Sequence, residues 1–408
     1  MKIKSLLFGA VFATLSLFVC PSARAVTFSG YAGIKGDVTQ DASSDSIDPE
    51  LSIQSYFAAQ FDFSSDFLIR TEFSIRTDDI INTGLFEDTE AIFCIDELSA
   101  TYIKPFLGIT QYFSLFVGTF EPIGSDVFLQ RHFGIKPIAS LITENWLGLK
   151  GSTVYPFYGV GASYVIQMNA KPVATGIYIY KNDENEEEEN QINLDLRFSS
   201  ATNFFSVDLA AGIGAPLNTK NGSEDVILLI DTLYLHTGID VLIGNNYSNA
   251  LFVQAGFDNL PIKAEDDVLE IDADDVYLLV EPRLYTQKYK AHLSMFSLPE
   301  KTVEKLVFVE DTFGFNLSIF TEKLYIKNKD FTFGFHTTVS FPDKNFYYAI
   351  KHTGDLFSDD VNYKISPFVS FKLLGGIFKT MLQVKLNQMN GDDWQNAVKL
   401  NLGFKAQL

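Results

Sequence analysis

The last eleven residues of the chain, 398–408, read VKLNLGFKAQL. Apolar residues alternate strictly with polar or small ones along this stretch, and the apolar set is Val398, Leu400, Leu402, Phe404, Ala406 and Leu408. A strict period of two indicates a β-strand with one apolar and one polar face. Terminal residues are commonly frayed, because few contacts offset the entropy lost in ordering a free end. We therefore expect this strand to be a structural part of a larger sheet, such as the closing strand of a cylinder.

The first 25 residues have the features of a secretory signal peptide. Two lysines precede an apolar run at residues 6–19, and small residues surround Ala23 and Ala25. This run is too short for a membrane-spanning helix, which needs about 20 residues. We therefore predict a cleaved signal at 1–25 and one mature domain at 26–408. Lipidation of Cys20 is the alternative, which the bulky residues before it disfavour. Export leaves Cys94 as the single cysteine, so no internal disulfide is expected.

The composition of the mature chain excludes one class of partner and favours one class of fold. After removal of 1–25, 28 basic and 51 acidic residues remain, a net charge of −23, which argues against binding to nucleic acid phosphates. Aromatic residues make up 14% of the chain, yet the mean hydropathy is only +0.09. No apolar stretch beyond the signal is long enough for a membrane helix. Many aromatic residues with neutral mean hydropathy are typical of a transmembrane β-barrel, because half of each strand faces water.

The alternation of the last strand recurs along the chain, at 50–63, 67–77, 362–373 and 378–387. Each run is about as long as a tilted strand that crosses a bilayer, roughly 9 to 11 residues. Apolar residues with this spacing would be spread around all sides of a helix, so a helical interpretation fails. The polar faces of these runs supply candidate pore-lining residues, namely Arg70, Glu72, Arg76, Lys372, Lys379 and Lys385.

The connections between these runs alternate between long and short. The long ones are predicted at 38–49, 78–91, 121–156, 183–189, 214–229 and 259–274. The short ones are predicted at 64–66, 105–108, 168–171, 199–203, 244–249 and 286–290. Outer-membrane barrels have this asymmetry, with short periplasmic turns and long external loops. Soluble β-sandwiches have no such rule and commonly have shorter strands.

Over its whole mature length, the chain resembles a bacterial outer-membrane β-barrel protein of the porin type. The C-terminal strand is similar to the assembly signal of that family, with Asn401 and Gly403 followed by hydrophobic Ala406 and Leu408, although family members usually end in an aromatic residue. The resemblance implies an all-β, transmembrane, antiparallel up-and-down barrel in the outer membrane of a diderm bacterium. Its implied partners are outer-membrane lipids and the barrel-assembly machinery, which would bind strand 398–408. A homo-oligomer is a further partner that the sequence leaves open.

The number of strands depends on the chain length and on one ambiguous segment. The 383 mature residues, at roughly 20 to 24 residues per strand, suggest about 16 to 18 strands, and a single-chain bacterial barrel has an even number. The segment 299–315 is either an extra strand or a folded loop. We predict 18 strands, with 16 as the alternative; a barrel of this size has room for a lumen.

The connection 121–156 is too long and too apolar to extend freely into water. The resemblance to porins implies that it folds into the barrel and narrows it. Arg131, His132 and Lys136 would then be constriction residues, close to the acidic residues Glu121, Asp126 and Glu144. The alternatives are two further strands within 126–149, or a cap on the surface.

The acidic segments 182–190 and 264–275 fall on predicted external loops. They lack the ordered ligand frame of an EF-hand, and a solvated, self-repelling surface is the preferred interpretation over a divalent-ion site. The five histidines are scattered, and no nucleophile or phosphate-loop motif is present. We therefore predict no enzymatic activity, no cofactor and no metal.

Passive diffusion of small hydrophilic solutes or ions is the predicted function. A barrel that displays its loops as an adhesin or structural surface protein is the alternative, and a transporter of hydrophobic substrates is less favoured. The predicted inner face is basic near the C-terminus; its members are Lys364, Lys372, Lys379, Lys385, Lys399 and Lys405, with Arg70 and Arg76 from an early strand. This favours a weak preference for anions at high salt. At low salt we expect the acidic external loops, whose charges are then less screened, to weaken or reverse this preference.

Overall fold

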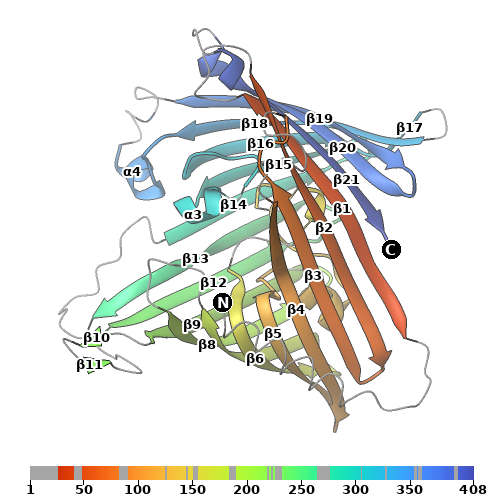
Figure 1. The fold of residues 1–408 in the computed structure, drawn as a ribbon, viewed down its shortest axis with the longest axis vertical. Helices are drawn as coiled ribbons and strands as arrows, with labels where there is room; N and C mark the ends of the chain where they lie inside the picture. Colours follow the sequence, from red (N-terminus) through yellow and green to blue (C-terminus); the bar gives the residue numbers. More distant parts are fainter. Residues whose placement is uncertain are drawn as a thin grey trace.

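The protein is a closed antiparallel β-barrel of 18 strands in the computed structural model (Figure 1). The structure describes residues 26–40, 48–81, 91–124, 126–143, 146–149, 155–182, 190–217, 220–221, 224–225, 232–263, 276–304, 306–326, 329–352, 356, 361–389 and 394–408. The predicted signal peptide and the acidic runs 183–189 and 264–275 lie outside these residues.

The first half of the wall consists of β1 (Thr27–Gln40), β2 (Pro49–Ser64), β3 (Phe67–Thr77), β4 (Ala91–Phe106), β5 (Ile109–Phe120), β6 (Phe157–Met168), β7 (Val173–Asn182), β8 (Gln191–Ala201) and β9 (Phe205–Pro216). The second half consists of β12 (Thr232–Ile243), β13 (Ala250–Lys263), β14 (Val276–Tyr285), β15 (Tyr289–Ser297), β16 (Phe313–Thr321) with β17 (Leu324–Ile326), β18 (Lys329–Phe341), β19 (Asn362–Leu373), β20 (Gly376–Lys385) and β21 (Val398–Gln407).

Each strand pairs antiparallel with the next along the chain, and the last pairs with the first. At this seam, Tyr31 lies opposite Gln407 and Val38 opposite Leu400. β16 and β17 both pair with β18, so they form one interrupted strand of the wall. The prediction of 18 strands is therefore confirmed. A separate hairpin of two strands with two residues each, β10 (Lys220–Asn221) and β11 (Glu224–Asp225), lies between β9 and β12.

The segment 299–315 is mainly a folded loop rather than an extra strand. It contains the short helix α3 (Glu300–Val303), and β16 begins only at Phe313. The predicted strands at 50–63, 67–77, 362–373, 378–387 and 398–408 correspond to β2, β3, β19, β20 and β21. The observed connections alternate as the sequence predicted, because the short ones span two to six residues and the third long one is 121–156.

The burial pattern is inverted relative to a soluble protein. On β8, Ile192, Leu194, Leu196 and Phe198 point outward and are 37–58% exposed. The alternating residues Asn193, Asp195, Arg197 and Ser199 point into the barrel and are at most 3% exposed. A wall that is apolar outside and polar inside suits a bilayer around the barrel. Among the described residues, no helix has the length and hydrophobicity needed to span a membrane.

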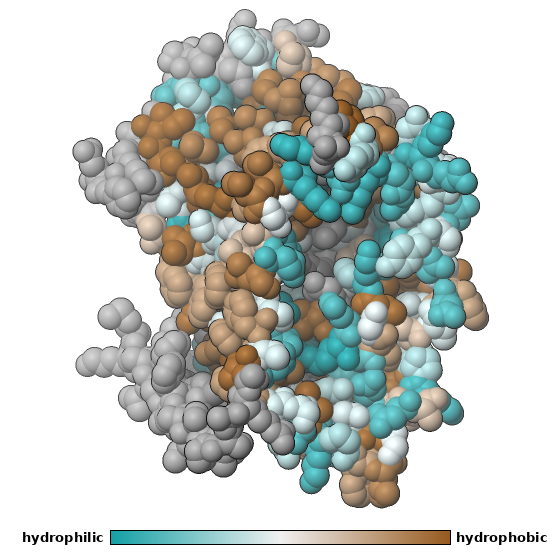
Figure 2. All heavy atoms as spheres, turned by 90° about the vertical axis from the view of Figure 1, so that its right-hand side faces the viewer, coloured by the Kyte–Doolittle hydropathy of each residue, from teal (hydrophilic) through white to brown (hydrophobic). Residues whose placement is uncertain are grey.

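Figure 2 looks at the side of the molecule on which the C-terminus and β17 lie in Figure 1. Hydrophilic residues occupy the middle and much of the right of this face, with hydrophobic residues around them. At the opposite, long-loop end, the helix α4 (Phe346–Lys351) covers a small apolar cluster that includes Phe313 and Phe341. The short 3-10 turns η3 (Leu386–Gln388) and η4 (Trp394–Ala397) connect β20 to β21.

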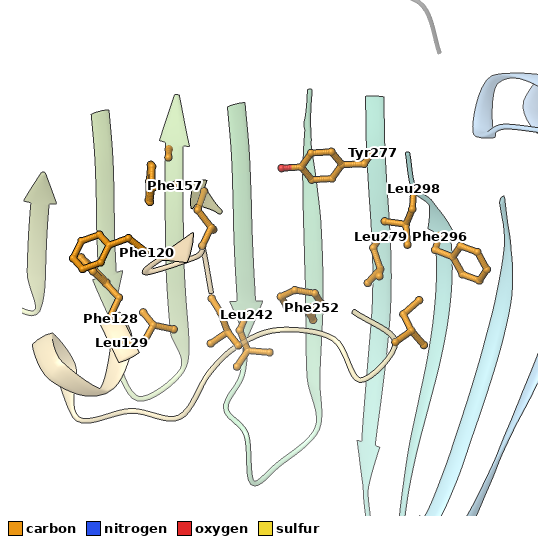
Figure 3. Close-up of a cluster of buried hydrophobic side chains, with 14 of the residues drawn as sticks. Phe120, Phe128, Leu129, Phe157, Leu242, Phe252, Tyr277, Leu279, Phe296 and Leu298 are labelled. Atoms are coloured by element: carbon orange, nitrogen blue, oxygen red, sulfur yellow. The ribbon is translucent and has the colours of Figure 1, made fainter. Parts of the chain in front are cut away.

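The barrel interior holds an apolar core, which an empty cylinder would lack. The connection between β5 and β6 contributes α2 (Asp126–Phe133) and η2 (Trp146–Gly148) to this core, and the connection between β15 and β16 contributes a second stretch. In Figure 3, Phe128 and Leu129 of α2 lie beside Phe120, and Leu242 and Phe252 continue the same cluster along neighbouring strands of the wall. The core members that come from the two connections are Ile123, Phe128, Leu129, Ile138, Ile142, Trp146, Leu298, Val303, Phe308 and Val309.

Candidate functional site

The candidate site is the barrel interior, where two inserted segments meet the inner wall. The first inserted segment is the described part of 121–149, and the second is the described part of 298–312. The first contains no strand among its described residues and is buried against inward-facing side chains. The prediction that this connection folds into the barrel is therefore confirmed, whereas the alternatives of two further strands and a surface cap are wrong for the described part.

Arg197 on β8 is the first anchor of this segment. Its guanidinium group donates to Asp208 on β9 through Nε at 2.9 Å and Nη2 at 2.6 Å. Its Nη1 donates to the carbonyl oxygen of Glu121 at 2.7 Å, and the group lies 3.6 Å from the ring centroid of Phe128. The backbone nitrogen of Gly124 also donates to Asp208, at 2.9 Å. A fully buried charge needs such complete pairing. The loop and the wall therefore supply each other's hydrogen-bond partners.

Arg283 on β14 is the second anchor. Its Nε lies 2.8 Å from Glu281, and its Nη2 donates to the carbonyl oxygen of Ala139 at 2.9 Å. Ser140 donates to the same Glu281 carboxylate. In the turn between β12 and β13, the side chain of Asn246 donates to the carbonyl oxygen of Pro137 at 3.0 Å. Since this is one of the short turns, the first segment extends to that end of the barrel.

The third anchor is the β1–β21 seam. Lys405 Nζ donates to the carbonyl oxygen of Gly148 at 2.7 Å and lies over the ring of Tyr31. A Cβ atom at Gly403 would collide with the indole of Trp146, and one at Gly33 would collide with Leu149. A larger residue at either position would displace these side chains, because the inserted segment approaches the wall so closely.

The predicted constriction residues take three different positions. Arg131 forms an ion pair with Glu121, as expected from the sequence. Lys136 is exposed, with Nζ 5.0 Å from the ring centroid of Tyr247. His132 is buried, with Nδ1 3.2 Å from Gln167 Oε1. The side chains of Asp126 and Glu144 lie outside the described residues.

The electrostatic environment of His132 fixes its charge state. Burial, followed by the positive charge of Arg131, lowers the pKa of His132 to about 3. The ring packs edge-on against Tyr112 on β5 and lies 4.3 Å from the ring of Phe128. His132 is therefore a neutral packing residue at physiological pH rather than a charge facing a passage.

The inner face of β1–β4 forms a polar sector, which includes three of the predicted residues. Arg70 Nε lies 2.8 Å from Glu97 and its Nη2 lies 3.5 Å from Glu72. The hydroxyl group of Tyr31 donates to Glu72 at 2.7 Å. Arg76, further along β3, is exposed. The other inward polar members of the polar sector are Lys35, Asp37, Ser52, Gln54, Gln60, Ser74, Ser99 and Thr101.

The three predicted lysines of β19 and β20 lie beside this polar sector. Lys379 Nζ lies 4.4 Å from the ring centroid of Trp146, 4.6 Å from that of Phe368 and 5.6 Å from that of Phe308. Lys385 Nζ lies 2.9 Å from Glu310. Lys372 is exposed near the β19–β20 turn and pairs with Asp330 at 3.1 Å.

The second inserted segment was not predicted as part of the site. Phe308 and Val309 are buried, and the ring centroid of Phe308 lies 4.1 Å from that of His336 on β18, with the two rings tilted. The sequence signal was the apolar run LVFV at 306–309 within a connection. A run of this kind indicates packing against something, just as the apolar character of 121–156 did.

Few groups in the described residues have the arrangement of a reactive centre. No group of three or more His, Cys, Asp or Glu side chains there is arranged to hold a metal ion. Ser318 Oγ lies 2.6 Å from His336 Nδ1, but both residues are at most 2% exposed beneath Phe308. This pair is part of the packing and has no access to a substrate.

A closed 18-strand barrel with an apolar exterior, a polar inner wall and an inserted third connection is the architecture of porin-type outer-membrane proteins. No protein-family model matches the chain, and no curated protein matches it. Among solved structures, a double mutant of Rh. blastica porin is 8% identical, with a TM-score of 0.41 over 94% of this chain and 100% of that chain.

Two further solved structures are similar to the same extent. Salmonella typhi OmpF in complex with daunomycin is 11% identical, with a TM-score of 0.40 over 94% of this chain and 97% of that chain. A loop-deletion mutant of Vibrio cholerae OmpT is 8% identical, with a TM-score of 0.37 over 94% and 99%. These superpositions are loose, and the fold assignment rests on the closed strand pairing of this chain.

Proposed function

We propose that the protein is an outer-membrane channel through which small hydrophilic solutes or ions diffuse passively. The observation that carries this proposal is the polar inner wall of β2–β4, which lies outside the anchors of the inserted segments. The inserted segments are anchored on β8, β9, β14 and the β1–β21 seam, whereas the inner face of β2–β4 remains lined with polar side chains. We place the proposed passage along the polar sector and beside the inserted segments.

The charges along this path support a channel with weak rather than strong selectivity. Several members of the predicted basic inner face are engaged by the inserted segments. Lys364 and Lys385 pair with Glu310, and Lys405 donates to Gly148. On the other side of the path, Arg70 is balanced by Glu72 and Glu97. A modest anion preference is the expected result, because the engaged lysines contribute little net field.

The location proposed for this channel is the outer membrane. Export would use the signal at 1–25 with cleavage after Ala25, and insertion would use the C-terminal strand 398–408. The inverted burial on β8 supports this location, because its exposed isoleucine and leucine side chains would otherwise face water. The mature protein should remain in the outer-membrane fraction through carbonate washing, and its N-terminal sequence should begin at Val26.

Current measurements on the purified full-length protein in planar lipid bilayers test the function. The expected result is stepwise, voltage-independent conductance with a reversal potential close to zero, displaced slightly toward anions, in a salt gradient. A folded, heat-modifiable protein that gives no current steps would contradict the channel and favour a barrel that serves as an adhesin or structural surface protein.

A further inference from the structure

Two lysines face each other across neighbouring strands at one end of the barrel interior. Lys364 on β19 lies directly opposite Lys385 on β20 in the strand register. Both side chains belong to the inward-facing set of their strands. Like charges directly opposite in an antiparallel pair destabilise the sheet, so an anion between the two ammonium groups would relieve their repulsion.

Glu310 of the second inserted segment supplies that anion. One carboxylate oxygen, Oε1, lies 3.2 Å from Lys364 Nζ, and the other, Oε2, lies 2.9 Å from Lys385 Nζ. Burial alone would raise the pKa of the Glu310 carboxyl, but the two lysines outweigh this effect and hold its pKa below the ordinary value. The glutamate therefore bridges the lysines as a carboxylate.

The bridging group is accessible from solvent, although one of its partners is not. The side chain of Lys364 is 7% exposed, whereas those of Glu310 and Lys385 are 44% and 39% exposed. Glu310 also lies on a connection rather than on the wall, and the neighbouring residue of the connection, Val309, is buried. A solute could therefore reach the lysines from the side on which Glu310 enters.

We propose that Lys364 and Lys385 form a binding station for small carboxylate solutes, which Glu310 occupies when no solute is present. The solute replaces the bridging carboxylate, one oxygen to each lysine, and the Glu310 side chain turns into the water. This inference rests on the proposed channel function, because it gives the path a step at which carboxylates are bound and released. It assigns a substrate class, small carboxylates, that the fold alone does not indicate.

Trp146 provides a direct readout of this exchange. Its ring lies 6.4 Å from that of Phe308, two residues before Glu310, and 4.4 Å from Lys379 Nζ. Trp394, the second tryptophan, is 48% exposed on η4. The full-length Trp394→Phe protein in detergent micelles therefore reports on Trp146 alone, and it does so whether or not the barrel conducts.

Sodium succinate is titrated into this protein, with sodium chloride at equal ionic strength as the reference. We expect a saturable change of Trp146 fluorescence with succinate and no saturable change with chloride. Glu310→Gln should lower the apparent dissociation constant by roughly two- to fivefold, which an ion pair between half-exposed groups can supply. Lys385→Gln should abolish saturation, and the exposed Lys288→Gln should leave it unchanged.

A shift of apparent size on heating in SDS establishes that each variant is folded. Lys385 is changed rather than Lys364 because the Lys385 side chain is less buried, so its replacement disturbs folding less. Equal responses to succinate and chloride, or saturation that survives Lys385→Gln, would overturn the station. Absence of conductance with intact succinate binding would instead contradict the proposed channel while leaving the binding site in place.

Discussion

Arg197 on β8 and Phe128 on α2 are in direct contact inside the barrel, with the guanidinium carbon 3.6 Å from the centroid of the phenyl ring. The same guanidinium group binds Asp208 and the carbonyl oxygen of Glu121. One side chain therefore joins two strands of the wall to the start of the first inserted segment, and a cation over an aromatic face adds to this attachment.

Arg197→Met should destabilise the barrel by about 3 to 5 kcal/mol, because Asp208 would remain as a buried charge without its partner. The free energy of unfolding in urea, measured on protein refolded into lipid vesicles, checks this value. Arg76→Gln is the matched control, since Arg76 is exposed, and it should change the free energy by less than about 0.5 kcal/mol. Equal effects of the two changes would mean that the Arg197 network does not hold the wall.

Leu382→Arg should impair insertion by about 2 to 4 kcal/mol, because Leu382 lies on the lipid-facing side of β20. Leu382→Met is the control and should insert normally. The fraction of protein that becomes resistant to unfolding in SDS, measured during folding into vesicles, follows both variants. Normal insertion of Leu382→Arg would show that this face does not contact lipid.

Trp146→Ala should increase the single-channel conductance. Trp146 is 2% exposed and contacts Lys379, Phe308 and the seam glycine Gly403. Removing a buried tryptophan costs about 3 to 5 kcal/mol of packing, which loosens the end of the first inserted segment and widens the path. Trp394→Ala, a change at the exposed tryptophan, should leave the conductance unchanged. An unaltered conductance of Trp146→Ala would place the passage away from this segment.

His132 should make the stability of the protein depend on pH below neutrality. Its pKa is about 3 in the folded protein and 6.5 ordinarily, so the unfolded state takes up the proton first as the pH falls. The packed neutral ring makes its full contribution to the free energy of unfolding above pH 6.5. As the pH falls from 6.5 to 3, this contribution is lost at up to about 1.4 kcal/mol per pH unit.

Urea unfolding of the wild type and of His132→Gln across this range measures the effect. The His132→Gln protein should have a flatter pH dependence, whereas His352→Gln, a change at an exposed histidine, should follow the wild type. If the free energies of unfolding of the wild type and of His132→Gln changed in parallel with pH, protonation of His132 would not destabilise the folded protein.

The wall of the barrel could be predicted from the sequence because its signal is local. Alternation within ten residues places Leu382 outside and Lys385 inside without any knowledge of the neighbouring strands. The strand number required one further fact, namely that 299–315 is mainly a folded loop. The apolar run at 306–309 allowed either interpretation, since short apolar runs occur both in strands and in packed loops.

The partners of the inner side chains could not be predicted, because they depend on register and on the path of the inserted segments. Nothing near Lys385 in sequence identifies Glu310, and nothing near Arg197 identifies Phe128. One overlooked signal is on β5, where Tyr112, Phe116 and Phe120 on the inner face alternate with Phe113 and Leu115 on the outer face. A strand with large apolar residues on both faces is packed on both, which marks the part of the wall that the first segment covers.

The small size of Gly33 and Gly403 links the packing of the first inserted segment to the register in which the barrel closes. Both glycines lie at the junction of the first and last strands, and each accommodates a bulky side chain of the 146–149 stretch. If β21 slid by two residues along β1, Lys405 or Asn401 would replace Gly403 beside Trp146, and the indole would no longer fit. We therefore expect Trp146 to pack against the wall only when the two chain ends are aligned in the native register, so that docking of the inserted segment depends on correct closure of the barrel.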